Sequence, residues 1–147
     1  MFNLIQLREI VIICSIFTFF FFCNDNKSTE PEETNLVGHW KISKMSWYGP
    51  ESGNFNQREL DSLGLVWDII LNLDNSAEQI TNLSGPITNQ TGTWSKDNNK
   101  LTMNLKAPTS DEVGTMVYTC AIENNILKLN WALPLGSINY VAEFIKQ

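Results

Sequence analysis

Few residues of this chain are suited to catalysis. The sequence has one histidine, His39, and three cysteines. It has neither a Gly-x-Ser-x-Gly elbow for a serine nucleophile nor a glycine-rich phosphate loop. The carboxylate pairs Glu32/Glu33 and Asp111/Glu112 lie in polar, turn-rich stretches, where solvated charge is expected. Because the chain has one imidazole and no cysteine cluster, we expect no metal site. We also expect no cofactor and no enzymatic activity.

The three cysteines lie in three different settings. Cys14 is inside the apolar run from Ile10 to Cys23, and Cys120 is in a stretch of alternating apolar residues. The body of the chain therefore has one cysteine, and no disulfide is expected within it. Cys120 is interpreted as a buried small hydrophobe rather than a nucleophile.

Cys23 marks a sharp change in composition. The 14-residue run Ile10–Cys23 is too short to span a bilayer comfortably and fits the hydrophobic region of a secretory signal. The stretch 24–35 that follows has four acidic residues and one basic residue, and such like charges keep a linker extended and solvated. We predict a signal peptide or anchor over residues 1–22, and a disordered acidic tether over 23–35 that starts at a lipidation cysteine.

This layout resembles that of bacterial lipoproteins, which are exported, cleaved before a cysteine and acylated on its thiol. The resemblance implies palmitate or a similar acyl chain on Cys23. It also implies attachment on the periplasmic or cell-surface side of a bacterial membrane, for example the outer membrane. Phe20, Phe21 and Phe22 depart from the small residues that normally precede such a cysteine. The alternative is an uncleaved anchor or an ordinary signal, and either would also place the body outside the cytoplasm.

The body, residues 36–147, is predicted to be one all-β domain. Its 112 residues suffice for a single core. Short alternating apolar runs separated by Asn, Asp, Gly and Ser are typical of antiparallel strands. Eight basic and eleven acidic residues, with no basic cluster, make nucleic acid an improbable partner. The predicted strands are Val37–Tyr48, Val66–Leu73, Glu78–Leu83, Gln90–Ser95, Lys100–Leu105, Thr115–Glu123, Ile126–Trp131 and Asn139–Lys146.

Most of the predicted strands are joined by short turns. Residues 74–76, 96–99 and 124–125 are rich in Asn and Asp, which tolerate a left-handed backbone. A long antiparallel meander protects its edges by closing, so we predict an eight-stranded up-and-down barrel. The exception is the long first connection, Gly49–Gly64, in which a capping box at Asn56 predicts a short helix. This connection is either a lid over one end of the barrel or a mobile surface excursion.

Gly38 and Trp40 orient the first predicted strand. Trp40 shares one face with Ile42, whereas His39 points to the other face and is interpreted as a solvated surface residue. A tryptophan there would plug the closed end of a barrel, and Gly38 would let another backbone approach closely. The apolar positions change phase after Ile42, which predicts a β-bulge near Lys44.

The Gly-x-Trp pattern at Gly38 and Trp40 resembles the one that opens the first strand of lipocalins. The resemblance continues at Gly92 and Trp94, which precede an Asn-rich turn and an alternating strand, as in bacterial lipocalin-like lipoproteins. It covers nearly the whole body. It implies a lipocalin-like barrel in which Gly38, Trp40, Gly92 and Trp94 have structural roles.

The interior of an eight-stranded barrel is either filled by side chains or holds one small ligand. Alternation predicts that the following side chains point inward: Trp67, Ile69, Leu71, Leu73, Leu101, Met103, Leu105, Met116, Tyr118, Cys120, Ile122, Leu127, Leu129, Trp131, Ile138, Tyr140, Ala142 and Phe144.

If there is a cavity, large side chains with polar tips are the residues expected to line it. The predicted function is then to bind or carry a small hydrophobic ligand at the membrane. The alternative is a packed barrel that acts as a protein-interaction or inhibitor module of the cell envelope. A third possibility is an enzyme using Asp, Glu or Tyr at the barrel mouth. The cavity candidates are Trp47, Trp67, Met103, Tyr118, Trp131 and Tyr140.

Overall fold

The structure, a computed structural model, describes residues 35–132 and 138–147. The predicted signal or anchor, Cys23 and nearly all of the predicted tether lie outside the described residues. Within the described part, no helix is both long enough and apolar enough to cross a membrane. The elements are β1 (Gly38–Tyr48), β2 (Gly53–Asn56), α3 (Gln57–Ser62), β3 (Trp67–Leu71), β4 (Ser76–Thr81), β5 (Thr88–Asp97), β6 (Lys100–Lys106), β7 (Val113–Glu123), β8 (Ile126–Ala132) and β9 (Asn139–Lys146).

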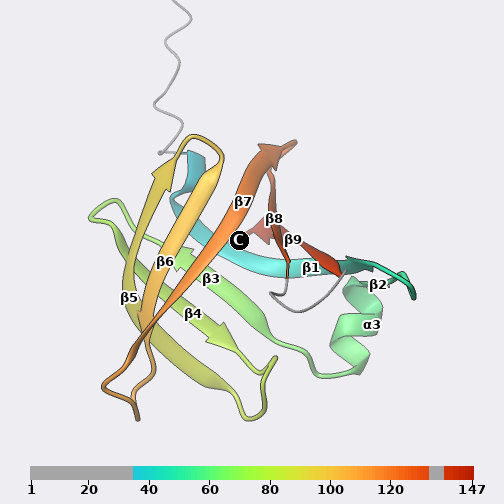
Figure 1. The fold of residues 1–147 in the computed structure, drawn as a ribbon, viewed down its shortest axis with the longest axis horizontal. Coiled ribbons are helices and arrows are strands. Elements are labelled where there is room, and N and C mark those ends of the chain that lie inside the picture. The colour runs from blue at the N-terminus through green and yellow to red at the C-terminus, as the bar shows by residue number, and fades with distance from the viewer. Residues whose placement is uncertain (1–34, 133–137) are drawn as a thin grey trace, which may run out of the picture. The chain divides into compact units, whose positions relative to one another are not determined.

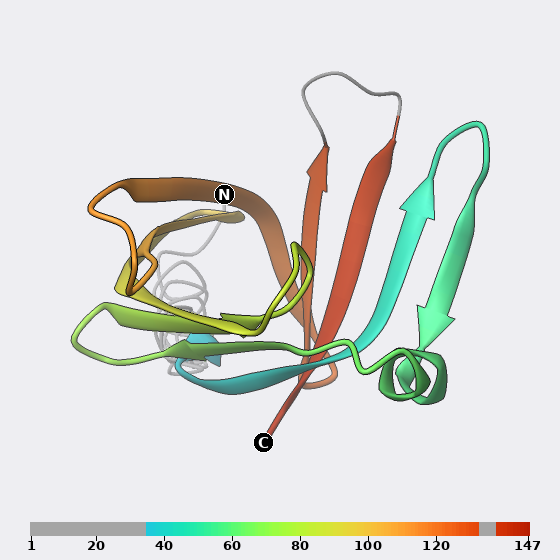
Figure 2. The same ribbon diagram turned by 90° about the horizontal axis from the view of Figure 1, so that it is seen from below.

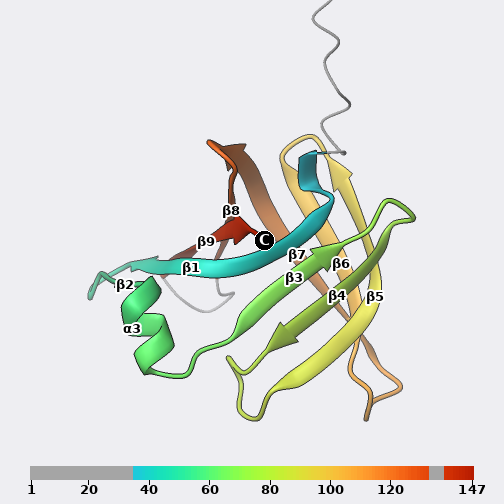
Figure 3. The same ribbon diagram turned by 180° about the vertical axis from the view of Figure 1, so that it is seen from behind.

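Eight of these strands form a closed antiparallel ring. Each strand from β3 to β9 pairs with the next, β1 pairs with β3, and β9 returns to pair with β1 (Figure 1). Figure 3 shows β1, β3, β4 and β5 side by side on one wall of this ring. The predicted up-and-down barrel is therefore confirmed. The bounds of its eight strands agree with the predicted bounds to within two residues.

The turns use the residues that the sequence analysis singled out. Asn75, Asn98, Asn124 and Asn125 all have positive φ, with values of 64°, 52°, 53° and 61°. In the β7–β8 turn, Asn124 and Asn125 both have positive φ, as the two central residues of a type I′ hairpin turn require, and the twist of such a turn matches that of the flanking strands. The Asn-rich turns therefore set the register of the neighbouring strands.

The ring is packed by the side chains that alternation predicts. Inward residues such as Ile69, Leu129 and Phe144 are fully buried. Ile138 and Tyr140 depart from the prediction, because they lie beside Trp47 outside the barrel. Leu73 departs from it as well, because β3 ends at Leu71 and Leu73 lies 76% exposed in the turn to β4. Its assignment to the inward face was wrong, since period-two alternation stops where a strand ends.

Strand β1 belongs partly to the barrel and partly to an extension of it. Residues 38–41 pair with β3, whereas residues 44–47 pair with β2 on the same edge, and β9 follows the other edge. The register with β9 shifts between Ile42 and Lys44, which confirms the predicted bulge. Beyond it, β8, β9, β1 and β2 continue as a four-stranded sheet that rises away from the barrel (Figure 2).

The first connection contains more structure than the sequence analysis predicted. The short helix is confirmed: the Asn56 side chain accepts from the Glu59 amide, and the Glu59 carboxylate accepts from the Asn56 amide. Strand β2 was not predicted, because its residues Gly53 and Asn54 disfavour strands. Pairing with the long β1 imposes the extended conformation.

Candidate functional site

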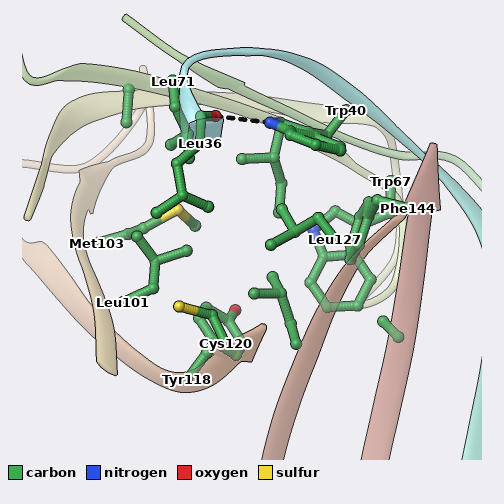
Figure 4. Packing of buried hydrophobic residues seen from close by; sticks show 14 of the residues in the cluster. Leu36, Trp40, Trp67, Leu71, Leu101, Met103, Tyr118, Cys120, Leu127 and Phe144 are labelled. Atoms are coloured by element: carbon green, nitrogen blue, oxygen red, sulfur yellow. Dashed lines mark hydrogen bonds between the residues drawn. The ribbon is translucent and has the colours of Figure 1, made fainter. Parts of the chain in front are cut away.

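One end of the barrel is closed by packed side chains, which Figure 4 shows. Trp40 is 1% exposed, and its indole Nε1 donates a hydrogen bond of 2.7 Å to the Leu36 carbonyl oxygen. The Lys146 ammonium lies 5.3 Å from the centre of the Trp40 ring, a cation–π contact. Aliphatic side chains of Leu71, Leu101 and Leu127 fill the space beneath it and are fully buried. Trp40 is therefore a buried, hydrogen-bonded part of this end of the barrel.

The other residues of the predicted structural motif also lie in tightly packed places. Gly38 has a φ of 145°, which side chains rarely adopt. A Cβ added at Gly92 would collide with the backbone carbonyl of Asn104 on β6. Trp94 is 4% exposed and donates from Nε1 to the Asn72 carbonyl oxygen at 3.0 Å. All of these contacts hold strands together and none presents reactive chemistry.

The opposite, open end contains a pocket of about 480 Å³, which we call the mouth pocket. Strand divergence makes room for it. Strand β7 pairs with β8 only from Thr119 onward, so the first half of β7 and the end of β8 separate. The mouth pocket is lined by Trp67, Gln79, Thr81, Leu83, Ser84, Gln90, Leu105, Ala107, Ser110, Glu112, Val113, Gly114, Met116, Tyr118 and Trp131.

Three aromatic rings form one wall of the mouth pocket. The Trp131 ring stands edge-on to Trp67 at 5.5 Å and to Tyr118 at 5.8 Å between ring centres. Trp67 also packs edge-on against the buried Phe144 ring at 5.1 Å. Such T-shaped contacts favour a fixed arrangement of the rings. The wall is thus preformed rather than assembled by a ligand.

Polar side chains of β4 and β5 form the adjoining wall, in which Thr81 is the direct cross-strand partner of Trp67. Gln79 and Thr81 are 5% and 6% exposed, which is unusual for polar residues. Gln79 Oε1 accepts from Trp67 Nε1 at 3.2 Å, and Gln79 Nε2 donates to Gln90 Oε1 at 3.1 Å. The Thr81 hydroxyl accepts from the Leu83 amide at 3.2 Å. The pocket therefore combines aromatic rings with an adjoining wall that is neutral and hydrogen-bonding.

Ionisable groups in the mouth pocket do not form a catalytic set. Burial raises the pKa of Tyr118 to about 12, and its hydroxyl lies 3.2 Å from Met116 Sδ. Glu112 lies on the exposed rim. Among the described residues, no group of three His, Cys, Asp or Glu side chains is placed to hold a metal ion. His39 was interpreted as a solvated surface residue; it is on the outer face but only half-exposed, with Nε2 3.1 Å from Asp68 Oδ2.

A second hollow, which we call the outer groove, lies on the sheet extension outside the barrel and has a volume of about 580 Å³. Trp47, Tyr140 and Trp131 are neighbours in one cross-strand row over β1, β9 and β8. Tyr140 stacks on Trp131 at 5.3 Å, so this row connects the outer groove to the mouth pocket. The outer groove is lined by Met45, Trp47, Pro50, Glu51, Phe55, Ile138 and Tyr140.

The structure separates the six cavity candidates into three groups. Trp67, Tyr118 and Trp131 line the mouth pocket, whereas Trp47 and Tyr140 line the outer groove. Met103 lines neither, because it is fully buried in the core on β6.

The sequence analysis missed the polar wall of the mouth pocket. The pattern Ala77-x-Gln79-x-Thr81 places these three residues on one face of β4, and Ala77 marks that face as buried. This was the available signal, but glutamine and threonine at alternate positions look like a solvated face.

Comparison with known proteins agrees with the fold. Residues 36–129 match the model of the lipocalin-like domain family. The chain therefore belongs to the lipocalin-like domain family, whose members are generally binding or carrier proteins rather than enzymes. No curated protein and no solved structure matches the chain. The match ends within β8, although β9 is needed to close the ring.

Proposed function

We propose that this protein binds or carries a small hydrophobic ligand in the mouth pocket of its barrel, as a membrane-anchored protein outside the cytoplasm. The observation that carries the proposal is the preformed wall of Trp67, Tyr118 and Trp131 around a hollow of about 480 Å³. This volume falls within the range of roughly 300–1,000 Å³ that is typical of small-molecule sites. Such sites combine apolar side chains with polar groups that orient the ligand, and the mouth pocket has both.

Binding can be tested with the neutral apolar dye Nile red added to the full-length chain. We expect quenching or a shift of tryptophan emission at concentrations up to tens of micromolar. No change in the emission of either protein or dye would contradict the proposal.

Two matched variants locate the bound dye. Trp131→Ala removes part of the mouth wall, whereas Trp47→Ala removes a ring from the same cross-strand row in the outer groove. Burying an aromatic side chain against a ligand contributes about 1.5–3 kcal/mol, which corresponds to at least about tenfold in affinity. We expect this loss for Trp131→Ala and less than about a twofold change for Trp47→Ala. The reverse pattern would place the ligand in the outer groove.

The anchor is the second part of the proposal, and it rests on the N-terminal sequence. The apolar run that ends at Cys23 and the acidic stretch after it support export and acylation of the Cys23 thiol. Mass spectrometry of the protein purified from its own cell type tests this. We expect a mass that lacks residues 1–22 and includes an added acyl chain. An intact N-terminus with an unmodified Cys23 would contradict acylation and leave the uncleaved anchor.

A protein-interaction or inhibitor module of the cell envelope is the alternative function. It is favoured by the apolar side chains of the outer groove, above all Trp47 and Phe55, whose rings lie 5.1 Å apart outside the barrel. Under this alternative, Trp47→Ala would abolish co-purification of an envelope protein, and Trp131→Ala would not.

A further inference from the structure

The mouth pocket has two chemically different walls, and this difference specifies its ligand. The aromatic wall of Trp67, Tyr118 and Trp131 offers ring faces and edges. The adjoining wall, beside Trp67, places Gln79 and Thr81 at buried positions of β4, where Ala77 is the apolar residue of the same face. Buried polar groups are costly unless they are hydrogen-bonded, so a polar wall inside a barrel calls for partners.

The hydrogen bonds of this wall leave spare donors on residues that line the pocket. The Gln79 carbonyl oxygen is taken by Trp67 Nε1, and one Gln79 N–H is taken by Gln90 Oε1. Two N–H groups of the Gln90 amide and one of the Gln79 amide are thus left to donate to a ligand. The Thr81 oxygen accepts from the Leu83 amide, which leaves its O–H as a donor. The wall therefore presents more donors than acceptors to a ligand.

The lining of the mouth pocket carries negative charge and no positive charge in the described part of the chain. Its lining residues include the acidic Glu112 and no lysine, arginine or histidine among the residues that the structure describes. Tyr118 is uncharged at neutral pH, as phenols are, and burial raises its pKa further, to about 12. A carboxylate entering this pocket would lose its hydration and meet a like charge at the rim without a cation to compensate.

We infer that the ligand of the mouth pocket is an uncharged apolar molecule that carries a neutral hydrogen-bond acceptor, such as an amide, ester or lactone carbonyl. The inference rests on the proposed function and names the ligand class of the same site. In the bound state, the acceptor oxygen faces the amide groups of Gln79 and Gln90. The apolar body of the ligand lies against Trp67 and Trp131. Free fatty acids, which are anionic at neutral pH, are disfavoured.

Matched ligand pairs test this inference on the full-length chain. Dodecanamide is compared with dodecanoate, and naphthaleneacetamide with naphthaleneacetate, each by calorimetric titration at pH 8. Within each pair the apolar body is constant and the acceptor is neutral or charged. We expect the amide of at least one pair to bind at least about tenfold more tightly than its carboxylate.

Two variants separate charge from hydrogen bonding. Glu112→Gln removes the like charge at an exposed position, where the substitution should not destabilise the fold. We expect it to reduce the difference in affinity between the amide and the carboxylate of a pair. Gln90→Lys adds a cation to the polar wall, and we expect it to reverse the preference toward the carboxylate. Gln90→Leu serves as a control that removes the donors without adding charge, and it should weaken the amide alone.

The outcomes distinguish this inference from the proposed function. Carboxylates that bind as tightly as their amides, or more tightly, would overturn the neutral-ligand inference and leave a ligand-binding barrel. If no member of either pair binds and Nile red also fails to bind, the proposed function fails and the inference fails with it.

Discussion

The two ends of the barrel are built from the same strands but filled in different ways. At the closed end, β3 contributes Leu71 and β8 contributes Leu127, and both side chains are fully buried. Four residues along the same strands, at the open end, stand Trp67 and Trp131, whose rings border the mouth pocket. Side chains alternate between the two faces of a strand, so all four of these side chains point inward. The two ends of each strand therefore differ in the size of the inward side chain and not in the face on which it lies.

This difference follows from how the strands pair. At the closed end the ring is continuous and its inward aliphatic side chains are fully buried, although a hollow of about 460 Å³ beside Leu36, Asn98 and Cys120 also lies at this end. At the open end the bulge after Ile42 takes β1 and β9 away with the sheet extension. The rings of Trp67 and Trp131 fill part of the wider space between the diverging strands, and the remainder is the mouth pocket. The closed end therefore holds the fold together, and the open end is left free to bind.

The largest expected effect comes from removing the buried tryptophan of the closed end. Trp40→Ala deletes a buried ring and its hydrogen bond to Leu36, and we expect a loss of about 3–5 kcal/mol in the free energy of unfolding. The matched change Trp131→Ala, at the partly exposed mouth, should cost about 1–2 kcal/mol. Urea denaturation measures both. Equal losses would mean that the two ends are packed alike.

The free energy of unfolding at alkaline pH tests the burial of Tyr118, which lies between the core and the mouth pocket. Its pKa of about 12 in the fold exceeds the value of about 10 for an unfolded tyrosine. The neutral phenol thus contributes stability that is complete below about pH 10 and is lost as the pH rises toward 12. The loss amounts to about 2–3 kcal/mol.

Tyr118→Phe should remove this component of the pH dependence, as measured by urea denaturation at a series of pH values between neutral and strongly alkaline. The same slope in Tyr118→Phe and the unmodified chain would show that the phenol is solvated.

Alanine substitutions at two glycines beside Leu105 compare how tightly strands pack within the ring with how tightly they pack at the wall of the mouth pocket. Gly92 and Gly114 pair with Leu105 from either side. A Cβ at Gly92 collides with the Asn104 carbonyl, whereas at Gly114 the nearest atom, the Leu105 oxygen, is 3.7 Å away. We expect Gly92→Ala to cost about 1–3 kcal/mol and Gly114→Ala less than about 0.5 kcal/mol. Thermal unfolding distinguishes them, and similar melting temperatures would contradict the tight approach of β5 to β6.

The smallest expected effect is at the β7–β8 turn, beyond the closed end. Asn125 has a φ of 61°, which glycine adopts without strain. The Asn-Gly pair is favoured in type I′ turns, but glycine also raises the entropy of the unfolded chain, so Asn125→Gly should stabilise the fold by only about 0.3 kcal/mol. Ligand affinity at the open end should not change. Destabilisation of similar size would contradict the turn geometry.

The barrel could be predicted from the sequence because its signals are local. Alternating apolar residues specify which face of each strand is buried, and Asn pairs such as Asn124 and Asn125 specify the hairpins between them. The bulge near Lys44 was visible for the same reason, as a change of phase. The sheet extension was not, because β2 contains Gly53 and Asn54 and becomes a strand only by pairing with β1.

The site was predictable only in part. Alternation identifies Trp67, Trp131 and Met103 equally as inward residues, but it does not tell which lie where the strands diverge. That depends on pairing between distant segments. Gln79 and Gln90 escaped notice because a buried amide and a solvated amide look the same in sequence. Their role appears when the Trp67 indole is found to donate to Gln79.

The most direct test of the account uses the methionine methyl groups, because Met45, Met103 and Met116 lie in the outer groove, the packed core and the mouth pocket, respectively. Carbon-13 labelling of the methionine methyls in the full-length chain, followed by titration with Nile red, reports on all three places at once. The account predicts that the Met116 signal shifts with saturation while the Met103 signal stays in place. A shift confined to Met45, or no shift at a dye concentration that saturates binding, would contradict a ligand site at the mouth of the barrel.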